Sequence, residues 1–183
     1  MTAANTFVAL LRGINVGGRN KVSMPELKSS LASLGLEDVV TYIQSGNVVF
    51  RSPTGDRKEI AAKMERQIAE AFGVRPTVLL RKPSELVKIA DGNPYLKGKA
   101  DHSKQLHVVF LGGRPSADAV ARLDPGRSPP DEFSVRGSEI YLHLPNGFGR
   151  SKLTLDYFER RLGLAATARN WNTLLKLIAL SQP

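Results

Sequence analysis

Residues 39–50, VVTYIQSGNVVF, decide the fold. Within them, two runs rich in β-branched and aromatic side chains, Val39–Ile43 and Val48–Phe50, flank Ser45-Gly46-Asn47. Glycine and asparagine accept the positive φ angles that tight hairpin turns require, so this stretch predicts two antiparallel strands. A short apolar run upstream, Thr6–Leu11, predicts a buried strand that precedes the hairpin.

Helices are predicted on both sides of the hairpin. Ser23 and Glu26 have the spacing of a capping box, which predicts that a helix begins here. Asp56 precedes a longer stretch in which apolar residues recur every four positions, and Gly73 closes it. A further strand is expected within Arg75–Arg81. The order of these elements is therefore βαββαβ.

The same order is predicted a second time. Residues 83–90 have the pattern of a short extra helix with Ser84 as its cap, and the stretch Asp91–Lys104, which contains Gly and Pro, is the best candidate for a linker. After it we expect a strand (Leu106–Leu111), a short helix (Ser116–Leu123), a hairpin (Glu132–Arg136 with Glu139–Leu144), a helix (Ser151–Leu162), a short strand (Ala166–Ala168) and a final helix capped by Asn170.

An α+β protein built from two ferredoxin-like (βαββαβ) subdomains accounts for both halves. Each subdomain is expected to be an antiparallel sheet with helices packed on one face, and a C-terminal helix follows the second. The expected boundaries are 1–91 for the first subdomain with its extra helix, 92–104 for the linker and 105–183 for the second subdomain. Two loose alignments suggest a duplication: VALLRG (8–13) with VVFLGG (108–113), and SGNVVF (45–50) with RGSEIY (136–141).

Composition narrows the class of protein. The chain has 183 residues, 42% of them hydrophobic, and it has no cysteine, which excludes disulfides, thiolate metal sites and cysteine nucleophiles. The net charge is +9, with 13 basic and 9 acidic side chains in residues 1–91 and 13 and 8 in residues 92–183. Because this charge forms no tail or run, it supports a general attraction to anions and no specific function.

Targeting and membrane segments are not predicted. The N-terminal apolar run is interrupted by Arg12 and is too short for a signal peptide. No stretch approaches the roughly 18 apolar residues of a transmembrane helix. We therefore expect a basic, cytoplasmic protein with no membrane partner.

The connection between the first strand and the first helix, residues 12–21 (RGINVGGRNK), is the most informative candidate site. Its three glycines allow the backbone to approach a ligand closely, and Arg12, Arg19 and Lys21 add charge-assisted donors for an anion. The glycine spacing nearly matches a Walker A motif, but Arg-Asn stands where that motif needs Lys-Ser or Lys-Thr, so we reject this motif. A phosphate-binding loop and a charged, solvated turn are both consistent with the sequence.

Two other segments repeat the combination of Asn with Gly or Arg: Gln44–Asn47 in the hairpin turn and Arg169–Thr173 before the last helix. Turn formation explains the first segment, and capping by Asn170 explains part of the second. Trp171 is expected to be a core anchor of the last helix, with an aromatic platform for a ring as the alternative. If the polar groups of these segments are mutually satisfied, a purely structural role is favoured.

No cofactor and no metal are expected. His102, His107 and His143 do not have zinc-ligand spacing, and the sequence contains no G-x-S-x-G elbow or pair of catalytic carboxylates. Aromatic residues make up only 7% of the chain, and the base-stacking pattern of RNA-recognition modules is not recognisable. Nucleic acid is therefore expected as a partner only through non-specific attraction to its phosphates.

Residues 10–50, LLRGINVGGRNKVSMPELKSSLASLGLEDVVTYIQSGNVVF, together with ARNWNT at 168–173, resemble the domain of unknown function 1697 family, whose members are mostly bacterial proteins of this length. The resemblance implies a pair of ferredoxin-like α+β subdomains, in agreement with the order of elements. It implies no established activity, substrate or cofactor. The matching positions are Arg12, Gly13, Asn15, Gly17, Gly18, Asn20, Ser45, Gly46, Asn47, Arg169, Asn170 and Trp171.

Three functions are consistent with these features. The first is a cytoplasmic binding protein for a phosphate-bearing small molecule, such as a nucleotide, or for nucleic acid. The second is an enzyme in which the same cluster orients a substrate and stabilises an oxyanion, with Ser45 or a bound substrate group supplying reactivity, although no general base is evident. The third is a structural or interaction module. The residues expected to bind a ligand are Arg12, Gly13, Asn15, Gly17, Gly18, Arg19, Asn20, Lys21, Ser45, Asn47, Arg169 and Asn170.

Overall fold

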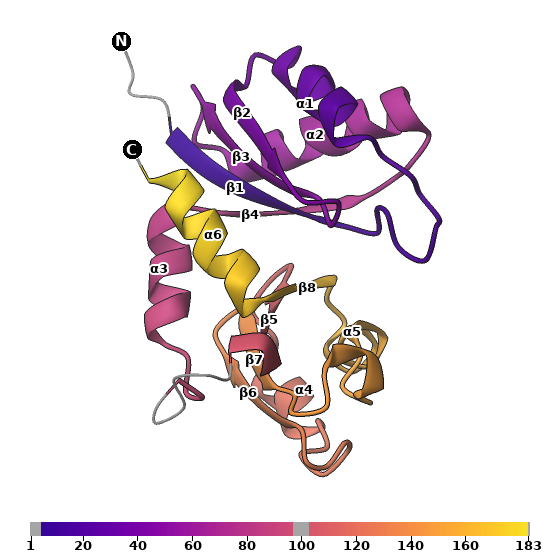
Figure 1. Cartoon of the computed structure of the whole chain (residues 1–183), viewed down its shortest axis with the longest axis vertical. Helices are drawn as coiled ribbons and strands as arrows, with labels where there is room; N and C mark the ends of the chain where they lie inside the picture. Colours follow the sequence, from indigo (N-terminus) through magenta and orange to yellow (C-terminus); the bar gives the residue numbers. More distant parts are fainter. Residues whose placement is uncertain (1–4, 97–102, 183) are drawn as a thin grey trace. The chain divides into compact units, whose positions relative to one another are not determined.

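A computed structural model describes residues 5–96 and 103–182 of the chain (Figure 1). The chain divides into two compact units: unit 1 comprises residues 1–87 with 177–183, and unit 2 comprises residues 88–176. The expected linker at 92–104 falls within the range of unit 2, and its residues 97–102 lie outside the described part.

Unit 1 is built on a four-stranded antiparallel sheet with the strand order β2-β3-β1-β4. Strand β1 lies inside the sheet, with Val8 opposite Val49 of β3 on one side and Arg81 of β4 on the other. Helices α1 and α2 cover one face of this sheet (Figure 1). The elements, in chain order, are β1 (Asn5–Arg12), α1 (Met24–Ala32), β2 (Glu37–Tyr42), β3 (Asn47–Ser52), α2 (Arg57–Phe72), β4 (Thr77–Arg81) and α3 (Pro83–Asp91).

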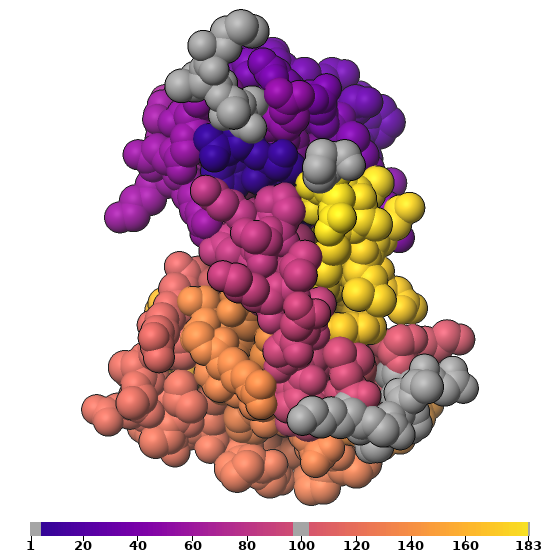
Figure 2. Space-filling view, turned by 90° about the vertical axis from the view of Figure 1, so that its left-hand side faces the viewer, coloured from indigo at the N-terminus to yellow at the C-terminus, as the bar shows by residue number. Residues whose placement is uncertain are grey.

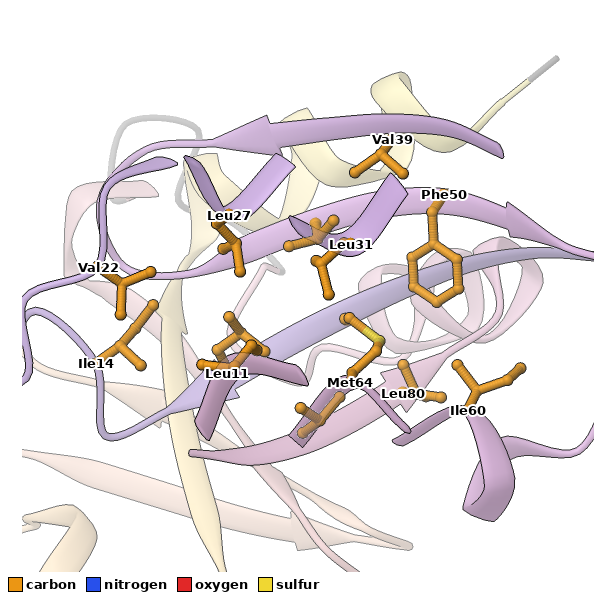
Figure 3. Close-up of a cluster of buried hydrophobic side chains, with 14 of the residues drawn as sticks. Leu11, Ile14, Val22, Leu27, Leu31, Val39, Phe50, Ile60, Met64 and Leu80 are labelled. Carbon is orange, nitrogen blue, oxygen red and sulfur yellow. The ribbon is translucent and has the colours of Figure 1, made fainter. Parts of the chain in front are cut away.

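The core of unit 1 lies between the sheet and the two helices. Phe7 of β1 and Phe50 of β3 pack with their ring centroids 6.0 Å apart. Leu27 of α1 and Met64 of α2 belong to the same buried cluster (Figure 3). The opposite face of β1 is buried as well, because Val8 is fully buried. Burial on both faces explains why this strand is apolar throughout instead of alternating.

Two helical segments from distant parts of the chain complete unit 1. Residues 83–87 of α3 and residues 177–181 of α6 lie side by side in Figures 1 and 2. Each segment contributes a fully buried leucine, Leu86 and Leu177. Unit 1 therefore draws on residues from near both ends of the chain.

Unit 2 repeats the topology, with the strand order β6-β7-β5-β8. Phe158 of α5 is fully buried in its core and packs edge-on against Phe133 at a centroid distance of 5.8 Å. The prediction of two ferredoxin-like halves and a C-terminal helix is confirmed. The elements are η1 (Ser103–Gln105), β5 (Leu106–Leu111), α4 (Ala117–Ala121), β6 (Glu132–Arg136), β7 (Glu139–His143), η2 (Phe148–Arg150), α5 (Leu155–Leu162), β8 (Ala166–Asn170) and α6 (Trp171–Ser181).

Most of the predicted helix caps are confirmed. The Asp56 carboxylate accepts hydrogen bonds from the amides of Lys58 and Glu59, and the Asn170 carboxamide oxygen accepts one from Thr173. The helices α2 and α5 both end at a glycine with a positive φ angle. These local signals are short-range, so they could be identified from the sequence alone.

Two predicted caps and one predicted helix start are wrong. Ser23 precedes α1, but its side chain makes no capping hydrogen bond, so the capping box with Glu26 does not form. Helix α3 begins at Pro83 instead of being capped by Ser84, and the Glu85 carboxylate accepts the preceding amide of residue 82. Helix α5 begins only at Leu155, capped by the residue 154 hydroxyl, because η2 precedes it.

Ser23 before α1 and Asp56 before α2 allow a direct test of which side chain caps its helix. We expect Asp56→Ala to lower the free energy of unfolding by about 1 kcal/mol, because two amides lose their acceptor. Ser23→Ala is expected to change it by less than about 0.5 kcal/mol, as at an ordinary surface position. Urea unfolding followed by circular dichroism measures both values. Equal losses of stability in the two variants would contradict the absence of a capping hydrogen bond from Ser23.

Candidate functional site

The candidate site of unit 1 is formed where the connection after β1 meets the turn between β2 and β3. The Leu11 amide at the end of β1 donates a hydrogen bond to the Gly46 carbonyl at 2.8 Å. The Asn15 side-chain amide donates to the Gln44 carbonyl at 2.9 Å. Two of the three predicted segments are therefore brought together at one end of the sheet.

The connection itself contains a miniature hairpin. Val16 and Arg19 form an isolated antiparallel bridge, and the Arg19 amide donates to the Val16 carbonyl at 2.9 Å. The two residues between them, Gly17 and Gly18, have φ angles of +56° and +77°. A two-residue turn with both φ angles positive matches strand twist and favours glycine at both positions.

Asn15 closes the base of this hairpin. Its carboxamide oxygen accepts the Val22 amide at 2.8 Å, and its nitrogen donates to the Val22 carbonyl at 3.0 Å as well as to Gln44. Asn15 has a φ angle of +52°, a conformation in which asparagine is enriched. We call this set of bonds the Asn15 clamp.

Further contacts hold the same segment against unit 1. The Asn20 side-chain amide donates to the Gly13 carbonyl at 2.7 Å, and the Asn15 amide donates to the Asn20 carbonyl at 2.9 Å. Below the clamp, Ile14 and Val22 are each only 2% exposed and take part in the hydrophobic core (Figure 3). The connection is therefore a built structure and not a loose loop.

The β2–β3 turn uses its own polar groups in the same way. Asn47 is fully buried, and its amide donates to the Tyr42 carbonyl at 2.9 Å and to the Ser45 hydroxyl at 3.0 Å. Gly46 has a φ angle of +79°, and a Cβ atom there would lie 2.8 Å from Leu11 Cβ. Ser45, Gly46 and Asn47 thus shape the turn and seat it against β1.

The residues left for a ligand lie at the far end of the hairpin. We call residues 16–21 the basic tip; each of them is exposed. Within the described part of the chain, Arg19 and Lys21 take part in no ion pair, and the amides of Gly17 and Gly18 have no hydrogen-bond partner. Residues 12–25 contain no acidic side chain. The tip therefore presents cations and backbone donors without a compensating carboxylate in the same segment.

The third predicted segment belongs to unit 2. Arg169 is 5% exposed and donates to the Thr167 hydroxyl and the Ala168 carbonyl, both at 2.8 Å. Burial lowers the pKa of Arg169 to about 10, so its guanidinium stays charged at neutral pH. Asn170 caps α6, and Trp171 is 4% exposed, which confirms the core-anchor prediction.

Arg12 differs from the other two cations near the tip. It is the last residue of β1, pairs with Thr77 of β4 and is half-buried, whereas Arg19 and Lys21 are exposed. Sequence reasoning missed Ile14 and Val22 as the anchors of the connection. The only signal in the sequence was that their side chains are apolar. Val16 is also apolar but is 65% exposed, so this signal does not distinguish the buried anchors from the exposed tip.

No group of three or more His, Asp or Glu side chains among residues 5–96 and 103–182 is placed to hold a metal ion. None of the helices described there combines the length and the apolar character needed to cross a membrane.

Comparison with known proteins places the chain in a family. The sequence model of a family of proteins of unknown function, DUF1697, matches residues 4–141. The chain belongs to the DUF1697 family. The matched range includes the Asn15 clamp, the basic tip and the β2–β3 turn, whereas Arg169 and Asn170 lie beyond it.

A solved structure shares the fold of this DUF1697 protein. It is the conserved bacterial protein SP0830 from Streptococcus pneumoniae, which is 24% identical, with a TM-score of 0.76 over 98% of this chain and 100% of that chain. At this identity the likeness concerns the fold alone. No curated protein matches the sequence.

Proposed function

We propose that this DUF1697 protein is a cytoplasmic binding protein for phosphate-bearing ligands and that the basic tip is its contact surface. The form of ligand that the tip suits best is the phosphate backbone of a nucleic acid. The residues that would make the contact are Arg19, Lys21 and the amides of Gly17 and Gly18.

The length of the connection carries this proposal. Residues 13–23 join β1 to α1 in unit 1, whereas residues 112–116 join β5 to α4 in unit 2, which has the same strand order. The fold therefore needs only the shorter connection. An exposed extension that the topology does not require, and that is held at its base by Asn15 and Asn20, is typical of a binding loop.

Electrostatics and pre-organisation support the same function. Guanidinium and ammonium groups that are not already paired with carboxylates can form charge-assisted hydrogen bonds to phosphate oxygens. The clamp fixes the backbone before the ligand arrives, so less conformational entropy is lost on binding. Every residue of the tip is exposed, and this suits an extended polyanion better than a nucleotide, which needs enclosing walls.

One observation favours a second function, a structural or interaction module. The side-chain amides of Asn15, Asn20 and Asn47 all donate within unit 1, so these motif residues serve the fold directly. For the enzyme hypothesis, the hydrogen bond described for Ser45 is one that its hydroxyl accepts from the Asn47 amide.

The charges of the tip provide the test. In a double variant, Arg19→Gln with Lys21→Gln, we expect the affinity for a fluorescein-labelled oligothymidylate to fall roughly tenfold at moderate salt. The slope of log K against log salt should become shallower by about 1.4, because two phosphate contacts are lost from a single strand. Fluorescence anisotropy titrations at several salt concentrations measure both quantities.

A matched double variant separates the tip from the overall charge. Lys58→Gln with Arg66→Gln removes the same two charges from exposed positions of α2 and should leave affinity and slope nearly unchanged. Equal losses of affinity in the two double variants, or no binding of the oligonucleotide by the unmodified protein, would refute the proposal. Competition by ATP that depends on the tip would identify a free nucleotide as the ligand.

A further inference from the structure

The turn between β2 and β3 contains a backbone conformation that is unfavourable for its residue. Ile43 has a φ angle of +49°, in the left-handed region that β-branched side chains disfavour most strongly. In the part of the chain that the structure describes, the other non-glycine residues with positive φ angles are Asn15, Asn20 and Asp38, whose types tolerate this region. Glycine or asparagine at position 43 would avoid the strain.

Folding gives little in return for the strain at Ile43. Its side chain is 47% exposed, so packing within unit 1 recovers only part of what the burial of an isoleucine can contribute. The topology does not require so long a turn, because residues 137–138 suffice between β6 and β7, whereas residues 43–46 are used between β2 and β3. Strained residues of this kind cluster at ligand-binding sites.

Ile43 lies beside the basic tip. Its chain neighbour Gln44 accepts, through the carbonyl, a hydrogen bond of 2.9 Å from the Asn15 side chain, and Val16, the first residue of the tip, follows Asn15. Val16 is 65% exposed. Two exposed aliphatic side chains therefore adjoin the cations of the tip at one end of the sheet of unit 1.

This combination suits a single-stranded nucleic acid. Its phosphates can meet the cations of the tip, while the faces of its unstacked bases offer apolar surface to Val16 and Ile43. In a duplex the same faces are covered by the neighbouring bases. Gln44 and Ser45, which follow Ile43 and are also exposed, can form hydrogen bonds to base edges, whereas insertion into a membrane would remove their water.

We propose that Val16 and Ile43 contact bases and that the ligand of the basic tip is a single-stranded nucleic acid. This inference rests on the function proposed above and names the form of its ligand. Each contact buries apolar surface that the free protein exposes. The strain at Ile43 is then the cost of holding an apolar side chain next to the cations of the tip.

An abasic oligonucleotide provides the test, because it carries the same phosphates as an oligothymidylate of equal length and no bases. In anisotropy titrations of the full chain, we expect fluorescein-labelled oligothymidylate to bind roughly tenfold more tightly than the abasic strand, and several-fold more tightly than its duplex with oligoadenylate. Equal affinity for the two single strands, or tighter binding of the duplex, overturns this inference and leaves the phosphate-binding function intact. Absence of binding by all three probes refutes that function itself.

A substitution in the turn locates the base contact. Ile43→Gly removes the side chain at a φ angle that glycine adopts without strain, so the variant should fold. Its affinity for oligothymidylate should fall roughly fivefold, because about half of an isoleucine is no longer buried on binding, and its affinity for the abasic strand should not change. An equal loss for both strands would contradict a base contact.

Leu175→Ala is the matched control, since Leu175 of α6 is exposed to nearly the same degree, 46%. It should leave the affinities for both single strands unchanged, and a loss equal to that of Ile43→Gly would contradict the assignment to the turn. Vesicles of phosphatidylglycerol test the other apolar partner. Binding to them that depends on Ile43, together with equal affinity for the two single strands, would assign the surface to a membrane and overturn the inference.

Discussion

Gly46→Ala is expected to lower the free energy of unfolding by about 3–5 kcal/mol, the largest effect of any substitution considered for unit 1. Two costs combine. The φ angle of +79° is unfavourable for any residue with a Cβ atom, and that atom would lie 2.7 Å from Ile14 Cδ1 and 2.8 Å from Leu11 Cβ. The Ile14 methyl can rotate away, but Leu11 Cβ is fixed to the backbone of β1, so the turn or the strand must move.

Gly35→Ala is the matched control for this prediction. Gly35 has nearly the same φ angle, +78°, but a Cβ atom there would meet nothing within 4 Å. This variant should therefore carry only the backbone cost of about 1–2 kcal/mol. Urea unfolding followed by circular dichroism gives both values, and the difference between them measures the contact of the turn with β1. Equal destabilisation by the two substitutions would show that this contact is not tight.

Asn15→Gly is expected to cost about 2 kcal/mol, because it removes all three backbone hydrogen bonds of the clamp while keeping a residue that tolerates a φ angle of +52°. Asn15→Ala should cost about 1 kcal/mol more, since alanine adds the backbone strain. The free energy of unfolding is again the measured quantity.

Hydrogen exchange identifies the cause of the Asn15 effect. The Val22 amide donates to the Asn15 carboxamide, so its protection should fall by at least tenfold in Asn15→Gly, while amides in the centre of β1 change only with global stability. Unchanged protection at Val22 would show that the clamp does not hold the connection. Loss of oligonucleotide binding in this variant, with Arg19 and Lys21 intact, would show that binding needs the ordered tip.

Topology could be predicted from the sequence because its signals are local and repeated. Strand periodicity, Asp56, Gly73 and Asn170 each act within a few residues, and the same order of elements occurs twice. The alignment of SGNVVF with RGSEIY is out of register by one residue. Val8 pairs with Val49, and Val108 pairs with Tyr141, so position 49 corresponds to 141 and not to 140. The register differs because residues 43–46 form the turn in unit 1, whereas residues 137–138 suffice in unit 2.

The roles of polar residues depended on burial, which composition does not reveal. Arg169 was expected to supply charge to a ligand, yet it is buried and donates to its neighbours in β8. Asn15 and Asn47 were expected as ligand contacts, and their amides are used by the backbone of unit 1.

The Asn15 clamp has a consequence for how sequences of this kind can diverge. The clamp and the Ile14 and Val22 anchors close the connection at its base, so the side chains of Arg19 and Lys21 take no part in holding it to the sheet. Substitutions at these two positions can therefore accumulate with little penalty to folding, whereas changes at the boundary cannot. Selection can thus retune what the tip recognises, residue by residue, on a scaffold that stays the same.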